Sequence, residues 1–177
     1  MPEWNWRGAV ALLAALVALA AVNLSIAGKE RLLANGRVVY LELAPVDPRS
    51  LMQGDYMQLD YQVAQEILRL LPRHAELAPG DGRAVVRLDE RSVARFERLV
   101  PDPDGAARPL ADNEAYLRYR VRDGRLKFAS DAFFFQEGTA EAYETARYGA
   151  YRVADDGELL LTALYDEQLR RLPIGNP

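Results

Sequence analysis

The sequence predicts an α+β protein, with a single N-terminal transmembrane helix followed by an antiparallel β-rich domain that contains two or three short helices. Three observations support this prediction. Residues 8–27 carry no charged side chain. Behind them, seven or eight short segments alternate apolar and polar residues between turn signals, a pattern typical of antiparallel strands. Residues 28–177 are numerous enough for one domain with a hydrophobic core and too few for two.

Residues 8–27 read GAVALLAALVALAAVNLSIA, and a helix of this length at ~1.5 Å per residue spans about 30 Å, the hydrocarbon thickness of a bilayer. Trp4 and Trp6 precede the segment, and amphipathic rings favour the level of the lipid headgroups. A cleaved signal peptide is the alternative interpretation. However, Glu3 offsets Arg7 in the leader, and the apolar run exceeds the ~7–15 residues usual in signal peptides. We therefore expect an uncleaved anchor.

The expected organisation is a tail at 1–7, the anchor at 8–27, a linker at 28–36 and a β-rich domain at 37–177. Two signals for orientation conflict. Lys29, Arg31 and Arg37 outnumber Arg7, and the positive-inside rule alone would place the domain in the cytoplasm. A short tail followed directly by a signal-like apolar run favours export instead. We therefore expect export. The scarcity of lysine relative to arginine is typical of a GC-rich bacterial genome, and in a bacterium the exported side of the inner membrane is the periplasm.

Composition limits the chemistry of the domain. A net charge of −4 and a pI near 5.2 argue against nucleic-acid binding, since no basic run is long enough to neutralise phosphates. The chain has no cysteine and a single histidine, His74, so neither a disulfide nor a transition-metal site is expected. No serine lies in a G-x-S-x-G or S-x-x-K pattern. Carboxylate pairs such as Asp55 with Asp60, or Glu137 with Glu141, could act as acid and base only if the fold brings them together. We expect no catalytic residue, metal or cofactor.

The strands follow from alternating apolar residues. They are expected at 37–43, 55–63, 84–88, 93–100, 116–121, 125–129, 148–154 and 158–165. Phe133, Phe134 and Phe135 are apolar on both faces, which predicts a central strand. A turn is expected at 79–82, a long loop at 101–112, and hairpin turns at the Asp-Gly pairs near 123 and 156. The apolar faces predict a core that includes Leu41, Leu59, Tyr61, Phe133, Phe135, Val153 and Leu161.

Helical segments are short. Asp47 is a good N-cap, Pro48 fits the first helical position and Gly54 fits a left-handed stop, which predicts one or two helical turns before residue 54. Apolar residues from Ala64 to Leu71 have the spacing of an amphipathic helix. We also expect a helix at 140–146 capped by Thr139, and a terminal helical turn at 166–172.

Residues 54–61 read GDYMQLDY, and at this point the chain resembles a family of bacterial membrane-anchored proteins named for the motif G-D-Y-x-x-L-x-Y. Every named position of the motif is matched. The preceding PVDPR, the stretch DAFFFQEG at 131–138 and the stretch ARYG-x-x-RV-x-x-x-G at 146–157 also resemble the family. The resemblance implies no activity, cofactor or catalytic residue. It implies a gene neighbourhood shared with a polytopic membrane protein, which is a candidate partner.

The motif has a structural and a functional interpretation. As architecture, Gly54 permits a positive φ, while Leu59 and Tyr61 point into the core from one face of a strand. Asp55 would accept backbone hydrogen bonds or pair with Arg49. As a site, a surface made of Asp47, Arg49, Asp55 and Tyr56 would bind a partner or ligand, because Arg, Asp and Tyr concentrated at a turn are typical of interfaces.

Two functional hypotheses remain open. The favoured one is a non-enzymatic accessory or partner-binding domain on the exported face of the bacterial inner membrane, acting with a polytopic membrane protein. Ala11, Ala14, Ala15 and Ala18 form a small-residue face on the anchor that would allow close helix packing in the bilayer. The alternative is an envelope hydrolase or ligand-binding module with a carboxylate-based site. An enzyme needs a pocket that gathers perturbed titratable groups, whereas a partner module needs an exposed apolar patch.

Overall fold

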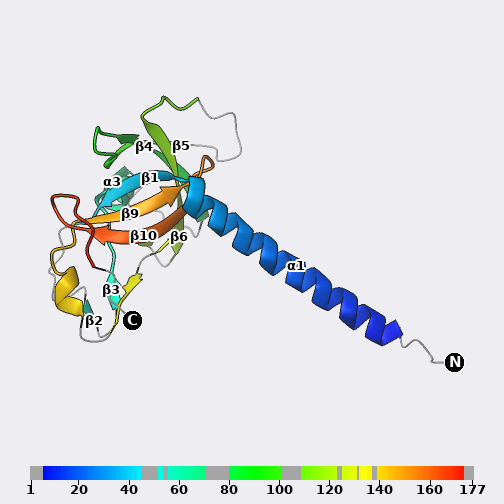
Figure 1. The fold of residues 1–177 in the computed structure, drawn as a ribbon. Coiled ribbons are helices and arrows are strands. Elements are labelled where there is room, and N and C mark those ends of the chain that lie inside the picture. Colours follow the sequence, from blue (N-terminus) through cyan, green and yellow to red (C-terminus); the bar gives the residue numbers. More distant parts are fainter. Residues whose placement is uncertain are drawn as a thin grey trace.

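The computed structural model describes residues 6–44, 52–53, 56–70, 80–100, 109–122, 125–130, 132–136 and 139–173. A long N-terminal helix leads into a β-rich domain (Figure 1). The helices are α1 (Trp6–Asn35), α3 (Gln62–Leu70) and the 3₁₀ helix η1 (Ala140–Tyr143). The strands are β1 (Arg37–Glu42), β2 (Met52–Gln53), β3 (Tyr56–Gln58), β4 (Gly80–Leu88), β5 (Ala94–Val100), β6 (Glu114–Arg122), β7 (Arg125–Lys127), β8 (Ala132–Phe134), β9 (Tyr148–Val153) and β10 (Leu159–Tyr165). The predicted α+β class, with an apolar N-terminal helix before antiparallel sheets, is confirmed.

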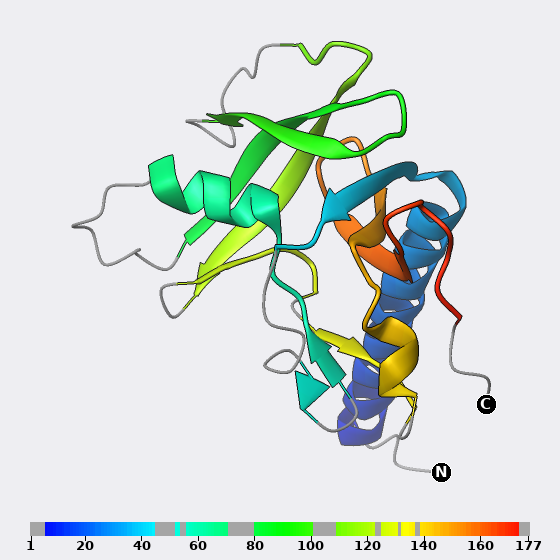
Figure 2. The same cartoon turned by 90° about the vertical axis from the view of Figure 1, so that its left-hand side faces the viewer.

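Two antiparallel sheets form the main part of the domain, which we call the two-sheet body. Their strand orders are β1-β9-β10 and β5-β4-β6-β7. The sheets meet on both sides. Tyr40 of β1 forms a parallel bridge with Val93, and the Arg118 N–H of β6 donates to the Gly157 carbonyl oxygen at 2.8 Å. The joined sheets therefore enclose a core between them (Figure 2).

The core of the two-sheet body comes from the alternation of its strands. Val39 and Leu41 of β1 are fully buried, and so are Tyr151 of β9 and Leu117 of β6. Of the predicted core residues, Leu41, Leu59, Tyr61 and Val153 are buried as expected. The other three are partly buried and pack against the edge of the same core; they are Phe133, Phe135 and Leu161.

A third, smaller sheet has the strand order β2-β3-β8, and we call it the motif sheet because β3 carries part of the GDYxxLxY motif. The prediction of a helical turn before residue 54 is wrong for Met52 and Gln53, which form the strand β2. These residues pair with Met57 and Tyr56, which leaves two residues between the strands. A Gly-Asp pair at that spacing is itself a hairpin signal, and it outweighs the capping pattern. The expected strand at 55–63 is shorter, because α3 begins at Gln62.

The prediction that Phe133–Phe135 form a central strand is wrong. β8 pairs with β3 alone among the described strands and lies at the edge of the motif sheet. Phe133 and Phe135 pack on the Tyr143 ring, with centroids 5.2 Å apart in both cases. Phe134 points the other way and is 74% exposed. The apolar run therefore reflects one packed face and one exposed aromatic ring.

The helix α1 does not end at Ala27 but continues through the residues that the sequence assigns to a linker. Leu32 is only 7% exposed. The Arg152 guanidinium of β9 donates to the Gly36 carbonyl oxygen at 2.9 Å, and Lys29 forms an ion pair with Glu158 beside β10. The last turns of α1 are therefore attached to the two-sheet body.

Three other local predictions need correction. Gly80 and Gly82 lie within β4 and do not form a turn; a side chain at Gly82 would collide with the Tyr119 ring of the neighbouring strand. Thr139 precedes a 3₁₀ helix, but its hydroxyl donates to the Gln136 carbonyl oxygen and does not cap the helix. The expected terminal helix is a tight turn, because Asp166 accepts three hydrogen bonds from residues 168 and 170 and the chain returns beside β10.

Candidate functional site

The second half of the motif lies in the core. Leu59 and Tyr61 are each 3% exposed. The Tyr61 hydroxyl forms a hydrogen bond with the Tyr151 hydroxyl of β9, and the Tyr61 ring also packs edge-on against Tyr151 and Phe128. A buried hydroxyl is costly unless it has a partner, so this pair fixes how the motif joins the two-sheet body.

A small cavity adjoins the buried part of the motif. Its lining includes Asp60, Tyr61, Phe128 and Ser130, and its volume is about 20 Å³. A space of this size holds roughly one water molecule. The buried half of the motif therefore offers no room for a substrate, and its geometry supports the structural interpretation.

The first half of the motif reaches the surface. Tyr56 of β3 pairs in register with Phe134 of β8, and the two ring centroids are 5.8 Å apart. Tyr56 is partly exposed and Phe134 largely so. We call these two side chains the aromatic edge. A large exposed apolar ring supported by a second aromatic residue is typical of contact surfaces.

Sequence reasoning named only one of these two residues. Phe134 was assigned to a buried strand together with its neighbours. The alternation of a strand is the signal that could have identified it. Successive side chains point to opposite faces, so Phe134 lies on the face opposite to Phe133 and Phe135.

The other proposed members of the site lie outside the described residues. They are Asp47, Arg49, Gly54 and Asp55. The expected pair between Arg49 and Asp55 therefore stays a prediction. The structure places Tyr56 of the predicted surface beside Phe134, and it buries Leu59 and Tyr61 of the predicted structural set.

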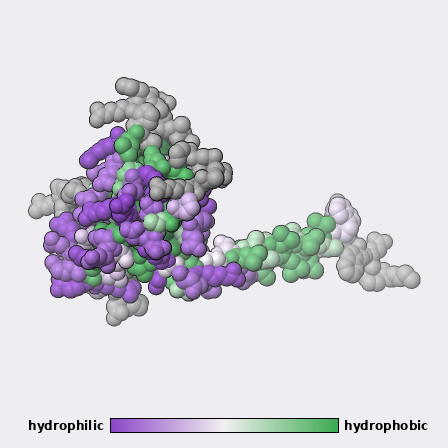
Figure 3. All heavy atoms as spheres, turned by 90° about the horizontal axis from the view of Figure 1, so that it is seen from above, coloured by the Kyte–Doolittle hydropathy of each residue, from purple (hydrophilic) through white to green (hydrophobic). Residues whose placement is uncertain are grey.

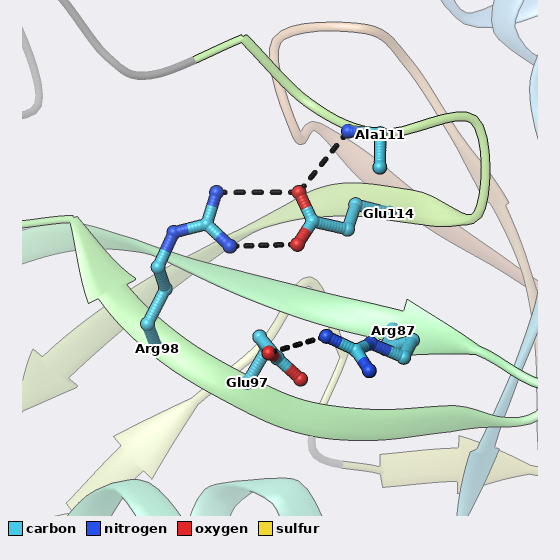
Figure 4. A network of polar contacts seen from close by, with 5 residues as sticks. All are labelled: Arg87, Glu97, Arg98, Ala111 and Glu114. Carbon is cyan, nitrogen blue, oxygen red and sulfur yellow. Dashed lines mark hydrogen bonds and ion pairs between the residues drawn. The ribbon is translucent and has the colours of Figure 1, made fainter.

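The pKa shifts of the titratable groups have structural causes. Arg98 of β5 reaches across β4 and donates to both carboxylate oxygens of Glu114, at 2.8 and 3.3 Å, while the Ala111 N–H donates to Glu114 at 3.2 Å (Figure 4). Arg87 of β4 and Glu97 of β5 form a second ion pair in the same sheet, at 2.6 Å. The hydrogen bond from Arg98 is the main cause that lowers the pKa of Glu114.

The remaining shifts follow the same logic. The Arg170 backbone N–H, followed by its guanidinium, lowers the pKa of Asp166, and burial raises the pKa of Tyr40, which lies against Tyr165. Burial also raises the pKa of Tyr119, so ion pairs, a turn and burial account for these shifts. Within the part of the chain that the structure describes, no group of three His, Cys, Asp or Glu side chains is placed to hold a metal ion.

Comparison with known proteins gives one match. The family model described as GDYXXLXY protein matches residues 18–164, from the middle of α1 to the end of β10. No curated protein and no solved structure matches significantly. The match covers most of the chain and includes both the buried and the exposed half of the motif. The protein therefore belongs to the GDYXXLXY family.

Proposed function

We propose that the protein is a non-enzymatic accessory domain, tethered by α1 to a bacterial inner membrane and exported to the periplasm, where it binds a polytopic membrane protein. The observation that carries the proposal is the uncovered apolar surface of α1. The helix is long and apolar enough to cross a membrane, and none of its apolar segment is buried against the domain. Figure 3 shows this segment as a hydrophobic rod outside a largely hydrophilic domain. Apolar surface of this extent needs a cover, and a bilayer supplies one.

The attachment of α1 to the two-sheet body supports a fixed position for the domain. Leu32 packs into the domain, while Lys29 and Gly36 contact Glu158 and Arg152. A helix attached in this way acts as a stiff support and not as a flexible linker. The domain would therefore stay close to the bilayer surface in one orientation.

In that orientation the motif sheet would face the membrane. In Figures 1 and 2, β2, β3 and β8 lie at the lower end of the domain, and the β4–β5 hairpin lies at the upper end. The helix α1 also descends from its junction with the domain in both views. The aromatic edge, Tyr56 and Phe134, would then meet the exported loops of a membrane partner. Aromatic side chains contribute strongly to such contacts because they bury a large area at little entropic cost.

The tether is tested by extraction and by fusion reporters. We expect the full chain to stay in the membrane pellet at alkaline pH. Alkaline phosphatase fused to Pro177 should be active and green fluorescent protein at the same site dark. The reverse pair of results would place the domain in the cytoplasm, and a mature chain that starts at Gly28 would refute the anchor.

The partner contact is tested by co-purification from membranes. Phe134→Ser should reduce the yield of the polytopic protein encoded beside this gene by roughly fivefold or more, since a central aromatic contact often contributes over 1 kcal/mol. Leu70→Ser is the matched control, because Leu70 is also exposed but lies on α3, outside the motif sheet. Equal yields from both variants would refute docking through the aromatic edge.

Ala14→Leu with Ala18→Leu tests the small-residue face of α1 in the same assay, and an undiminished yield would show that α1 is only a tether.

A further inference from the structure

A groove of about 730 Å³ lies where α1 joins the two-sheet body. Its residues come from the first part of β4, the second part of β6, the segment after β7, the start of β10 and one turn of α1; they are Lys29, Asp81, Gly82, Arg83, Arg118, Tyr119, Arg120, Phe128, Ala129, Glu158, Leu159 and Leu160. Phe128 and Leu159 are buried, whereas Lys29 and the two β6 arginines are exposed. The groove therefore has an apolar inner wall and a charged rim, and we call it the arginine groove.

The charge of the arginine groove is opposite to that of the whole chain. Four cationic side chains and two carboxylates line it, an excess of two positive charges in a protein whose net charge is −4. Asp81 pairs with Arg122 at 3.0 Å, and Glu158 pairs with Lys29. Each carboxylate is thus paired with a cation other than the groove's three arginines. These arginines are therefore available to an added anion.

Two of these arginines lack an acidic partner. Within the described residues, Arg83 and Arg120 form no ion pair; Arg83 lies over the Tyr116 ring at 5.3 Å from its centroid. Arg118 pairs only with Asp156, at 3.2 Å, through side chains that are about half exposed. Such an exposed pair is weak and exchanges readily with another anion.

The sheet register brings like charges together. Arg83 of β4 is the direct cross-strand partner of Arg118 of β6, whereas Arg120, two residues further along β6, lies opposite Asp81, whose carboxylate pairs with Arg122. Like charges placed directly opposite each other destabilise a sheet. An anion bound between the guanidinium groups would relieve this repulsion, because a planar guanidinium donates two parallel hydrogen bonds to phosphate or carboxylate oxygens.

The position of the groove identifies the anion. Lys29 lies two residues beyond the apolar segment 8–27, about 3 Å along the helix axis. If α1 spans the bilayer, Lys29 and the groove stand at the level of the headgroups, with an apolar inner wall beside the charged rim. We propose that the arginine groove binds the phosphodiester headgroup of a net-anionic membrane lipid, through Arg83, Arg120 and Arg118. The choice of a lipid rests on the proposed membrane tether, whereas the anion site itself does not.

The test uses the full chain purified in a neutral detergent, so that it does not depend on membrane orientation. Phosphatidylglycerol and phosphatidylcholine are added in equal amounts, and the lipid retained by the protein is measured by native mass spectrometry. We expect a clear preference for phosphatidylglycerol. Arg83→Gln with Arg120→Gln should reduce its retention by roughly tenfold, because two charge-assisted contacts are lost.

The control variant is Arg69→Gln with Arg147→Gln. These two arginines are exposed, as Arg120 is, and within the described residues they form no ion pair and lie outside the groove. The double substitution changes the net charge by the same amount. We expect this variant to retain phosphatidylglycerol as the parent does. Arg120→Gln alone, at an exposed side chain without an ion pair, provides a second variant that should fold normally and still lose several-fold in retention.

Four results would contradict parts of the proposal. Equal retention of the two lipids, or equal losses in the groove and control variants, would overturn the proposal. Displacement of phosphatidylglycerol by millimolar glycerol phosphate, but not by glycerol, would assign the groove to a soluble phosphate ester and overturn the lipid assignment. Release of the full chain from the membrane pellet at alkaline pH, with lipid preference intact in detergent, would refute the tether and leave the anion site standing.

Discussion

The two-sheet body and the motif sheet differ in how they use their aromatic residues. In the two-sheet body Tyr151 is fully buried, and its hydroxyl meets that of Tyr61. In the motif sheet the rings of Tyr56 and Phe134 lie against each other at the surface. The GDYxxLxY motif connects the two regions, since Tyr56 lies in β3 and Tyr61 lies directly before α3.

The contrast shows that one short motif can serve two purposes. Its second tyrosine holds the motif sheet to the core through a buried hydrogen bond. Its first tyrosine supports an exposed ring on a three-stranded sheet whose strands are only two or three residues long. The free energy of unfolding should therefore depend mainly on the two-sheet body, and partner binding on the aromatic edge.

The largest effect is expected for truncation in the two-sheet body. Leu41 is fully buried between β9 and the rest of the core, so Leu41→Ala should reduce the free energy of unfolding by about 2–5 kcal/mol. Urea unfolding of the full chain in detergent, followed by near-ultraviolet circular dichroism, measures this loss. A loss below about 1 kcal/mol would mean that the body is not the stabilising region.

A smaller effect is expected where the motif meets the body. Tyr61→Phe and Tyr151→Phe each remove one hydroxyl of a buried hydrogen bond, which should cost about 1–2 kcal/mol apiece. The double variant should cost less than the sum, because both changes remove the same contact. Fully additive losses in this double-mutant cycle would show that the two hydroxyls act independently.

Acid should weaken the β5-β4-β6-β7 sheet through Glu114. Its pKa is lowered in the folded state, so its contribution to stability is present above the pKa of the unfolded chain and is lost as the pH falls through the folded value. Arg98→Gln should therefore reduce the dependence of the unfolding midpoint on pH between neutrality and about pH 3. The comparison variant is Arg87→Gln, which breaks the neighbouring pair with Glu97 and removes only a minor charge effect on the pKa of Glu114, so it should reduce the acid dependence much less. An unaltered pH profile in Arg98→Gln would contradict the assignment.

The smallest effect on stability is expected at the aromatic edge. Phe134→Ser removes a ring that is 74% exposed, so the free energy of unfolding should change by less than about 1 kcal/mol. A loss comparable to that of Leu41→Ala would show that the motif sheet is part of the stabilising core, and it would remove the basis for assigning Phe134 to a contact surface.

The sequence predicts the two-sheet body well because its strands alternate cleanly. Residues 37–43 and 148–165 have one apolar face each, and the observed strands follow them closely. Prediction was poorer in the motif sheet. Capping residues before Gly54 and a hairpin signal at Gly54 compete for the same stretch, and only the pairing of Gln53 with Tyr56 distinguishes them.

The candidate site could be predicted only in part, because it is assembled from distant segments. Tyr56 and Phe134 are neighbours through the pairing of β3 with β8, which no local pattern shows. The arginine groove had a local signal, since Arg118 and Arg120 alternate along the strand predicted at 116–121 and must share a face. Its position beside Lys29 depends on the tertiary packing of α1, which the sequence does not reveal.

The central claim is that α1 spans the membrane and holds the domain on the exported side, and cysteine labelling tests it most directly. The chain contains no cysteine, so single cysteines have no background. In intact spheroplasts, a membrane-impermeant maleimide should label Glu90→Cys, on the exposed surface of the domain, and should not label Glu3→Cys or Leu16→Cys. Permeabilisation should expose Glu3→Cys, while Leu16→Cys should stay unlabelled because a thiol in the hydrocarbon core does not ionise. Labelling of Glu3→Cys with protection of Glu90→Cys would reverse the orientation, and labelling of Leu16→Cys in intact spheroplasts would contradict the anchor itself.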